Sequence, residues 1–178
     1  MRVITLVLMT YFIVIFQVAV APAFSLIGDS FNLPLIFVIG ISLFRPKSEF
    51  VIWAIILGVL IDAMAVYSLN IMIFIFPFIA LAGNYLLKKF WGKPGIIPFL
   101  ILTALFSLFY QLIIFSAKLS FSPGEESFMV LFTSNLSCYL RNSLKAILVN
   151  CVLLVPLFYF IFLRLNQLFE YWDQKKKI

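Results

Sequence analysis

The fold is decided by residues 53–89, which read WAIILGVLIDAMAVYSLNIMIFIFPFIALAGNYLLKK. From Phe50 to Leu87 the chain runs for 38 residues with a single charged side chain, Asp62. One transmembrane helix needs about 20 apolar residues, because the hydrocarbon layer is roughly 30 Å thick and a helix rises about 1.5 Å per residue. The stretch is therefore long enough for two spans, and the more polar residues 66–70 (VYSLN) supply a turn between them. It predicts a helical hairpin with one acid near its tip.

The composition of the whole chain places the protein in a membrane. Apolar residues make up 65% of the sequence, charged residues make up 11%, and the mean hydropathy is +1.17. A soluble protein is roughly 45–50% apolar and 25% charged, and this chain has too few polar side chains to cover a water-facing surface. Its apolar runs are long and continuous, whereas the strands of a membrane barrel are short and alternate. We expect an all-α polytopic membrane protein.

The apolar runs predict a single transmembrane domain, residues 1–178, with about six spans. The first contains Ala19-Val20-Ala21, which has the form of a signal-peptide cleavage site. Because Pro22 would follow the cut and the apolar stretch exceeds the usual ~7–15 residues, we expect an uncleaved span. The second is short, so it recruits residues from Ser30 onward, lies where the bilayer is thin, or does not cross. The expected spans are 3–21, 31–44, 49–66, 70–87, 96–117 and 146–163.

Charge predicts how these spans are oriented. With six spans and cytoplasmic N- and C-termini, ten of the thirteen Lys and Arg residues lie on the inner side, as the positive-inside rule requires. A five-span arrangement with an outside N-terminus still places nine of the thirteen Lys and Arg residues on the inner side. We prefer six spans because the alternative must export Arg2 and the α-amino group.

Apolar residues at helical spacing between Phe128 and Leu140 also predict an interfacial helix, or an early start of the last span.

Few residues in the sequence suggest catalysis or metal binding. Histidine is absent, and Cys138 and Cys151 lack metal-ligand spacing, so we interpret both as packing residues. There is no glycine-rich phosphate loop and no pair of acids inside a span. The net charge of +6 is explained by inner loops that face anionic lipid, so nucleic acid is not an expected partner. We expect no cofactor, no metal and no enzymatic activity.

Asp62 is the exception, because a carboxylate within a span is costly and needs a partner or a function. Gly58 lies one helical turn earlier on the same face and would let another helix approach closely. One interpretation is that Asp62 sits near the outer end of its helix and reaches interfacial water. The other is that it pairs with Arg141 or Lys145, two cations that the six-span arrangement leaves on the outer side.

Other polar residues within the expected spans predict contacts between helices. Four amides are expected to hydrogen-bond across helices, at about 0.6 to 2 kcal/mol each. Two prolines are expected to kink their helices by removing a backbone hydrogen bond. The amides are those of Gln17, Asn84, Gln111 and Asn150, and the prolines are Pro77 and Pro156.

Several motifs in residues 34–90 resemble the MreD family, small polytopic subunits of the bacterial rod-shape system. That family combines a long first helix, a proline that opens a short second helix, a basic turn, and a third helix with Gly-x-x-x-Asp near its end. The corresponding residues are Pro34-Leu35-Ile36, Arg45-Pro46-Lys47, Gly58 to Asp62 and Tyr67 to Asn70. The family's usual turn glycines are replaced by Ser68 and Asn70, and the last third of the chain matches by hydropathy alone.

The resemblance implies a non-enzymatic subunit in the cytoplasmic (inner) membrane of a bacterium. Such proteins bind MreC, work with MreB filaments, and help regulate peptidoglycan synthesis by RodA and its penicillin-binding transpeptidase partner. We expect partner helices to pack on small-residue faces, Gly58 with Ala54 or Ala80 with Gly83. The candidate interaction residues are Asp62, Gly58, Asn70, Arg141 and Lys145.

Two other functions remain open from the sequence. The family's fold is similar to the substrate-binding subunits of energy-coupling-factor vitamin transporters, which have six spans and an outward cavity. That alternative predicts a polar pocket formed by residues such as Asp62, Asn70, Gln111 and Arg141. A lipid-modifying enzyme or flippase is a third class, for which the chain offers few catalytic groups.

Overall fold

The computed structural model describes residues 2–21, 32–64, 71–120 and 140–175. All regular elements in these ranges are helices, in agreement with the expected all-α class. In chain order they are α1 (Arg2–Ile15), the π-helix η1 (Phe16–Val20), α2 (Leu33–Phe44), α3 (Lys47–Met64), α4 (Met72–Phe90), α5 (Ile96–Ser120), helical residues 140–148, the π-helix η4 (Val149–Leu154) and α7 (Val155–Lys175).

Three of the described helices are long and apolar enough to cross a membrane: Met72–Phe90, Ile96–Ser116 and Leu140–Gln167. The apolar helices Ile4–Val20 and Leu33–Phe44 are shorter. The outer surface of the bundle carries many exposed large apolar side chains, among them Phe12, Phe74 and Phe160. Such a surface suits lipid and would be unfavourable in water. The structure supports a helical membrane protein, and the number of spans stays a prediction.

The predicted spans and the observed helices correspond closely in the first two thirds of the chain. The largest difference concerns the last span. The sequence predicts a span over residues 146–163, whereas the observed helix runs from residue 140 to residue 175. The prediction used charge to end the span, but a helix continues past charged residues when its backbone hydrogen bonds are not interrupted. Of the expected interfacial helix, residues 128–139 lie outside the described part, and Leu140 belongs to the long helix.

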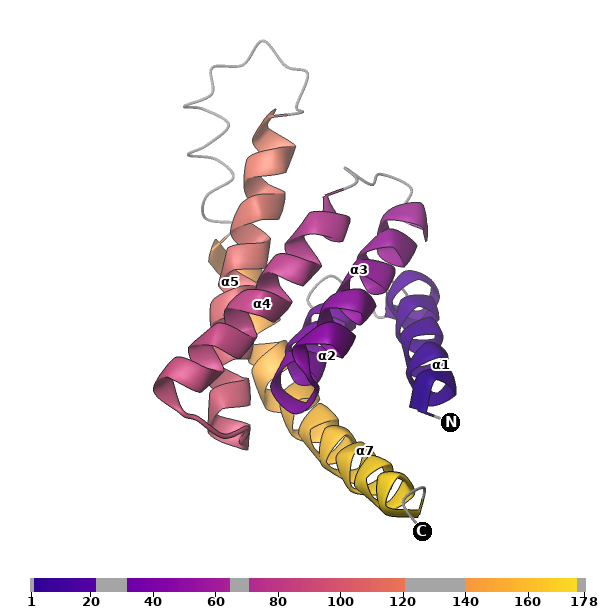
Figure 1. Ribbon diagram of the computed structural model, residues 1–178. Coiled ribbons are helices and arrows are strands. Elements are labelled where there is room, and N and C mark those ends of the chain that lie inside the picture. Colours follow the sequence, from indigo (N-terminus) through magenta and orange to yellow (C-terminus); the bar gives the residue numbers. More distant parts are fainter. Residues whose placement is uncertain (1, 22–31, 65–70, 121–139, 176–178) are drawn as a thin grey trace.

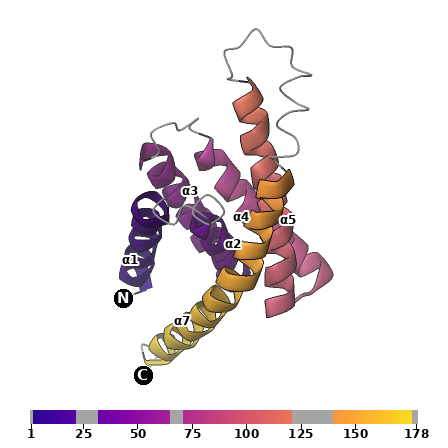
Figure 2. The same ribbon diagram turned by 180° about the vertical axis from the view of Figure 1, so that it is seen from behind.

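The short helix α2 lies at the centre of the bundle. Every residue from Leu33 to Leu43 is buried, and α2 contacts α1, α3, α4, α5, η4 and α7. Figures 1 and 2, which view the bundle from opposite sides, show α2 between the α3–α4 hairpin and α7. Because α2 is surrounded by protein, its ends meet other helices and need not reach the two membrane surfaces. Asn32 is not helical, so α2 does not extend toward Ser30 as one of the alternatives required.

The expected hairpin is present as α3 and α4, which are side by side and make the most extensive contact between helices in the structure. A tight turn leads from α2 into α3, where Arg45 donates a hydrogen bond to Glu49 (2.9 Å from Nε to Oε2). The connection of the hairpin itself, residues 65–70, lies outside the described part.

Candidate functional site

Buried polar groups gather where the N-termini of α2 and α4 meet the other helices. The first group is formed by Gly58 and Asp62 of α3, at the start of α4. The Ile73 N–H donates to the Asp62 carboxylate (3.0 Å to Oδ2), and the Asp62 residue is buried. The first N–H groups of a helix have no partner within it, so a carboxylate there satisfies a donor and also faces the positive end of the helix dipole.

Gly58 makes this contact possible. A Cβ atom at Gly58 would lie 2.7 Å from the Met72 carbonyl oxygen and 2.8 Å from the Ile73 Cα atom. Both are backbone atoms, so only glycine lets α4 begin this close to α3. The Gly-x-x-x-Asp motif therefore has a local explanation: the glycine admits the start of α4, and the acid one turn later accepts its N–H.

The second group lies at the N-terminus of α2. The Asn32 side chain caps the helix by accepting from the Leu35 N–H (3.1 Å), and Pro34 lies in the first turn. Two further amides complete this end. Gln17 accepts from the Leu33 N–H (3.2 Å), and Asn150 accepts from the Asn32 N–H (3.2 Å). Unpaired backbone donors are costly inside a membrane, and these side chains remove that cost for the buried end of α2.

Both amides that reach α2 come from π-helices, Gln17 from η1 and Asn150 from η4. Each π-helix ends two residues before a proline in the sequence, Pro22 and Pro156. A proline has no N–H, and its ring crowds the carbonyl four residues earlier, which favours a wider turn upstream. Pro156, within the described helix α7, thus provides a physical reason for the irregular segment η4.

Side chains of α5 complete the second group and connect it to the first. The Asn150 amide donates to the Ser107 hydroxyl (3.3 Å), and both residues are buried. Tyr110 lies close to the Asn32 side chain and within electrostatic range of the Asp62 carboxylate. We call this set, Gln17, Asn32, Asp62, Ser107, Tyr110 and Asn150, the polar network.

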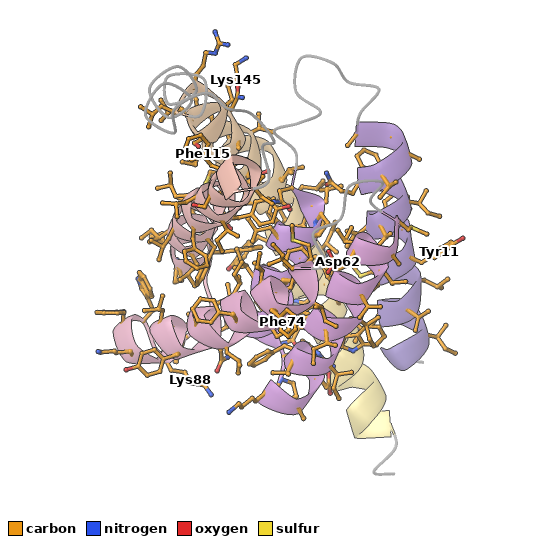
Figure 3. All side chains as sticks on the ribbon, turned by 90° about the horizontal axis from the view of Figure 1, so that it is seen from above. Tyr11, Asp62, Phe74, Lys88, Phe115 and Lys145 are labelled. Carbon is orange, nitrogen blue, oxygen red and sulfur yellow. The ribbon has the colours of Figure 1, made fainter. Side chains whose placement is uncertain are left out.

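The expected ion pair of Asp62 with Arg141 or Lys145 does not occur. Asp62 is buried and its carboxylate accepts from a backbone N–H, whereas both cations are exposed on helical residues 140–148. Figure 3 shows Asp62 in the interior of the bundle and Lys145 at a separate edge. The reason is that a helix N-terminus supplies the positive charge locally. Asn70 lies outside the described residues.

The small-residue faces expected to receive partner helices are used within the chain. Ala54 and Ala80 are fully buried, and Gly58 packs against the start of α4. A Cβ atom at Gly83 would lie 3.2 Å from Ser42 Oγ on α2. These residues pack the hairpin against itself and against α2, so the prediction of partner contacts at these faces was wrong.

The prediction that amides hydrogen-bond across helices is confirmed for three of the four residues. Gln17 and Asn150 hydrogen-bond to the α2 N-terminus as described above, and the Asn84 amide donates to the Ser42 carbonyl (2.7 Å).

Chemically, the polar network pairs donors with acceptors and, with the Ile73 N–H of α4, joins six helical segments. No group of three His, Cys, Asp or Glu residues that could hold a metal occurs in the described ranges.

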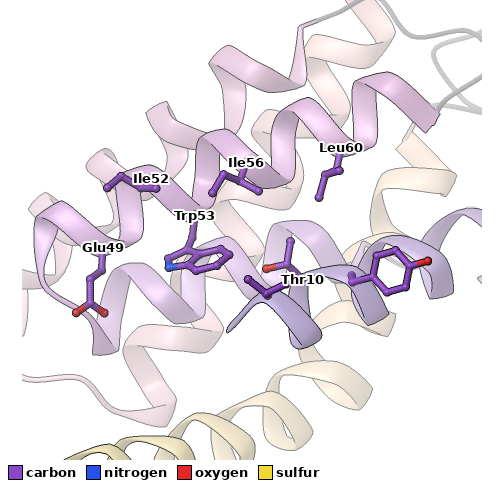
Figure 4. Close-up of a pocket in the computed structure, with 8 residues that line it drawn as sticks. Thr10, Glu49, Ile52, Trp53, Ile56 and Leu60 are labelled. Carbon is purple, nitrogen blue, oxygen red and sulfur yellow. The ribbon is translucent and has the colours of Figure 1, made fainter. Parts of the chain in front are cut away.

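Two apolar grooves flank α1, which makes few contacts with the rest of the bundle. The first, between α1 and α3, has a volume of about 510 Å³ and is shown in Figure 4. The second, between α1 and the η4–α7 region, has a volume of about 500 Å³. Neither groove is lined by Asp62, Gln111 or Arg141, the described residues from which the transporter alternative expects its pocket.

Three members of the polar network, Asn32, Ser107 and Tyr110, were not singled out from the sequence. Asn32 had a recognisable signal, because Asn two residues before a proline is typical of a helix N-cap followed by its first turn. Ser107 and Tyr110 had none, since a lone hydroxyl in an apolar helix does not indicate what it faces. No family model, curated protein or solved structure matches this chain.

Proposed function

We propose that this chain is a non-enzymatic membrane subunit of the bacterial cell-elongation complex, of the MreD type. It binds an MreC-like protein through helices in the membrane and helps regulate peptidoglycan synthesis by RodA and its transpeptidase partner. It works in the cytoplasmic membrane, with both termini and the basic turns on the cytoplasmic side.

The observation that carries this proposal is the geometry of Gly58 and Asp62 at the start of α4. The motif on which the resemblance rests has a definite role here, since both residues hold the α3–α4 hairpin closed. Two other features of the resemblance adjoin the same unit: Pro34 opens the central helix α2, and residues 45–47 form the turn from α2 into α3. Three of the motifs that carry the resemblance therefore form one connected piece of structure, which supports the proposal, and the fourth, Tyr67 to Asn70, lies outside the described residues.

The outer surface agrees with a subunit that acts through helix contacts. Large apolar side chains are exposed on all the helices except α2, and the described grooves open on this surface. Association of helices in a membrane depends on close packing and on interhelical hydrogen bonds. Regulation of an enzyme by such a subunit requires that its helices contact those of the enzyme or of an intermediary protein.

The test is purification of the tagged chain in a mild detergent from the bacterium that encodes it. We expect to recover the MreC-like protein of that genome, and depletion of the chain is expected to turn rod-shaped cells round. A Gly58→Leu variant, which cannot close the hairpin, is expected to lose the partner. Gly95→Ala serves as the matched control, because its added Cβ would meet the Pro98 ring at ordinary contact distances, 3.5 Å to Cδ and 4.0 Å to Cγ. A folded chain that recovers no MreC-like protein contradicts the proposal.

A further inference from the structure

The turn between α4 and α5 joins two helices that are both long and apolar enough to cross a membrane (Figure 1). Only residues 91–95 separate the two helices. The Trp91 and Gly92 N–H groups close the turn by donating to the Leu87 carbonyl (2.9 Å each), and Gly92 has a φ of +72°, a conformation that commonly ends a helix. Two consecutive spans are joined outside the hydrocarbon layer, so we expect this turn at the level of the lipid headgroups.

Three lysines gather at this turn without an acidic partner. Lys88 and Lys89 belong to the last turn of α4, Lys93 lies in the connection, and all three are exposed. The sequence has no acid between Asp62 and Glu125, and none of the three lysines forms a salt bridge within the described residues. The partial negative charge at the end of α4 and the partial positive charge at the start of α5 oppose each other. The described part of the chain therefore leaves the three lysine charges unbalanced.

Exposed aromatic rings surround these lysines. Tyr85 is 61% exposed, Phe90 is 64% exposed and Trp91 is 37% exposed. The Lys89 Nζ atom lies 5.7 Å from the centres of both the Tyr85 and the Phe90 ring, so two rings hold one ammonium group by cation–π contacts. Trp and Tyr are enriched where a membrane meets water. A water-soluble acidic partner would meet the ammonium groups and leave the rings uncovered, whereas a phospholipid covers the rings with its acyl chains and meets the ammonium groups with its phosphate.

We propose that the turn between α4 and α5 is a binding site for an anionic phospholipid. Lys88, Lys89 and Lys93 donate to the phosphate of its headgroup, and its acyl chains pack along Phe90 and Ile97, which is 62% exposed. A zwitterionic headgroup brings its own cation to this turn, where the lysines repel it, so the site selects a headgroup with net negative charge. The inference does not depend on the proposed function, because it uses only two adjacent helices and the side chains at their turn.

The test places the photo-crosslinking amino acid benzoylphenylalanine at position Phe90 of the full-length chain, where it keeps an aromatic ring. The chain is reconstituted in nanodiscs of equal amounts of phosphatidylglycerol and phosphatidylcholine with identical acyl chains, and mass spectrometry identifies the lipid adducts. Phe74, at the other end of α4 and 73% exposed, is the matched control position (Figure 3). We expect phosphatidylglycerol adducts to exceed phosphatidylcholine adducts at least about fivefold at position 90, the preference that a single lysine supplies near a membrane surface, and a ratio near one at position 74.

Two combined variants test the lysines with the probe at position 90. Replacing Lys88, Lys89 and Lys93 together by glutamine is expected to bring the ratio close to one, whereas replacing all three by arginine keeps the charge and retains the preference. All three side chains are exposed, so neither variant is expected to lower the thermal stability of the chain. A ratio near one in the unsubstituted chain, or an unchanged ratio in the glutamine variant, overturns the inference. Equal enrichment at position 74 also overturns it, because the charge of the whole chain would then attract the lipid.

A single variant distinguishes a bound headgroup from diffuse attraction. Tyr85→Leu removes one ring beside Lys89 and leaves the charge unchanged, so the preference at position 90 is expected to fall about twofold, the contribution of one exposed cation–π contact. Diffuse attraction predicts no change in this variant. The same probe in native membranes tests the other class of occupant: an adduct with a protein in place of phospholipid at position 90 overturns the inference.

Discussion

Replacing Gly58 by alanine tests the closest approach between α3 and α4. The added Cβ would lie 2.7 Å from the Met72 carbonyl oxygen, whereas ordinary contacts begin at 3.4 Å, so the start of α4 must recede. A shift of about 0.7 Å would stretch the bond from Ile73 N to Asp62, now 3.0 Å, to about 3.7 Å, beyond hydrogen-bonding distance. Overpacking costs about 1–3 kcal/mol and the lost bond to a charged acceptor about 1.5 kcal/mol. Alanine regains about 1 kcal/mol of helix propensity, which leaves a net loss of about 1.5–3.5 kcal/mol.

The assay is equilibrium unfolding of the purified chain in mixed micelles, followed by circular dichroism as the denaturing detergent increases. Gly83→Ala is the matched control within a helix, because its added Cβ would meet the tip of the Ser42 side chain at 3.2 Å and no backbone atom closely. We expect the control to change the free energy of unfolding by less than about 1 kcal/mol. If Gly58→Ala is as stable as the control, the close approach of α4 to α3 is refuted.

Three further predictions concern the acid, the core and the orientation. Asp62→Leu is expected to destabilise the chain by about 1–3 kcal/mol in the same unfolding assay, because it leaves the Ile73 N–H unpaired, whereas Asp62→Asn retains an acceptor and costs less. Gly40→Ala is expected to destabilise the contact of α2 with α7, since its Cβ would overlap the buried Phe162 ring, and Phe162→Leu in the same chain is expected to recover part of the loss. In a background without the native cysteines, Lys93→Cys is expected to react with an impermeant thiol reagent only from the cytoplasmic side, and Lys145→Cys only from the outside.

The predictions on the acid and on the orientation have outcomes that contradict them. Recovery of stability in the charge-swapped variant Asp62→Arg with Arg141→Asp would restore the ion-pair interpretation that the structure rejects. Equal loss in Asp62→Asn and Asp62→Leu would show that the oxygen acceptor is unimportant. Labelling of positions 93 and 145 from one side would overturn the six-span orientation.

The hairpin and the approximate limits of most helices were predictable from the sequence, because they depend on local properties. The run from Phe50 to Leu87 is too long for one helix, and a polar stretch divides it. The role of Gly58 as a point of close approach was also predictable. Which element approaches it was not, because that depends on the three-dimensional path of the chain after residue 64.

The partner of Asp62 was mispredicted for a physical reason. A search of the sequence for positive charge finds side chains such as Arg141, but the dipole and free N–H groups at a helix start leave no mark in the composition. The central place of α2 was equally hidden. Hydropathy reports that residues 35–44 are apolar, and lipid-facing and protein-facing helices are both apolar, so a short helix enclosed by others cannot be distinguished from a short span.

The enclosed position of α2 has a consequence for how the protein is made. The helix has 12 residues, about 18 Å of length, and a ribosome produces it well before α4, α5 and α7 exist to surround it. Asn150, whose amide accepts from the Asn32 N–H at the start of α2, is translated 118 residues after Asn32. Residues 32–44 therefore reach their final place only after the chain up to Asn150 has entered the membrane, so assembly of this bundle proceeds from its periphery toward a centre that was translated early.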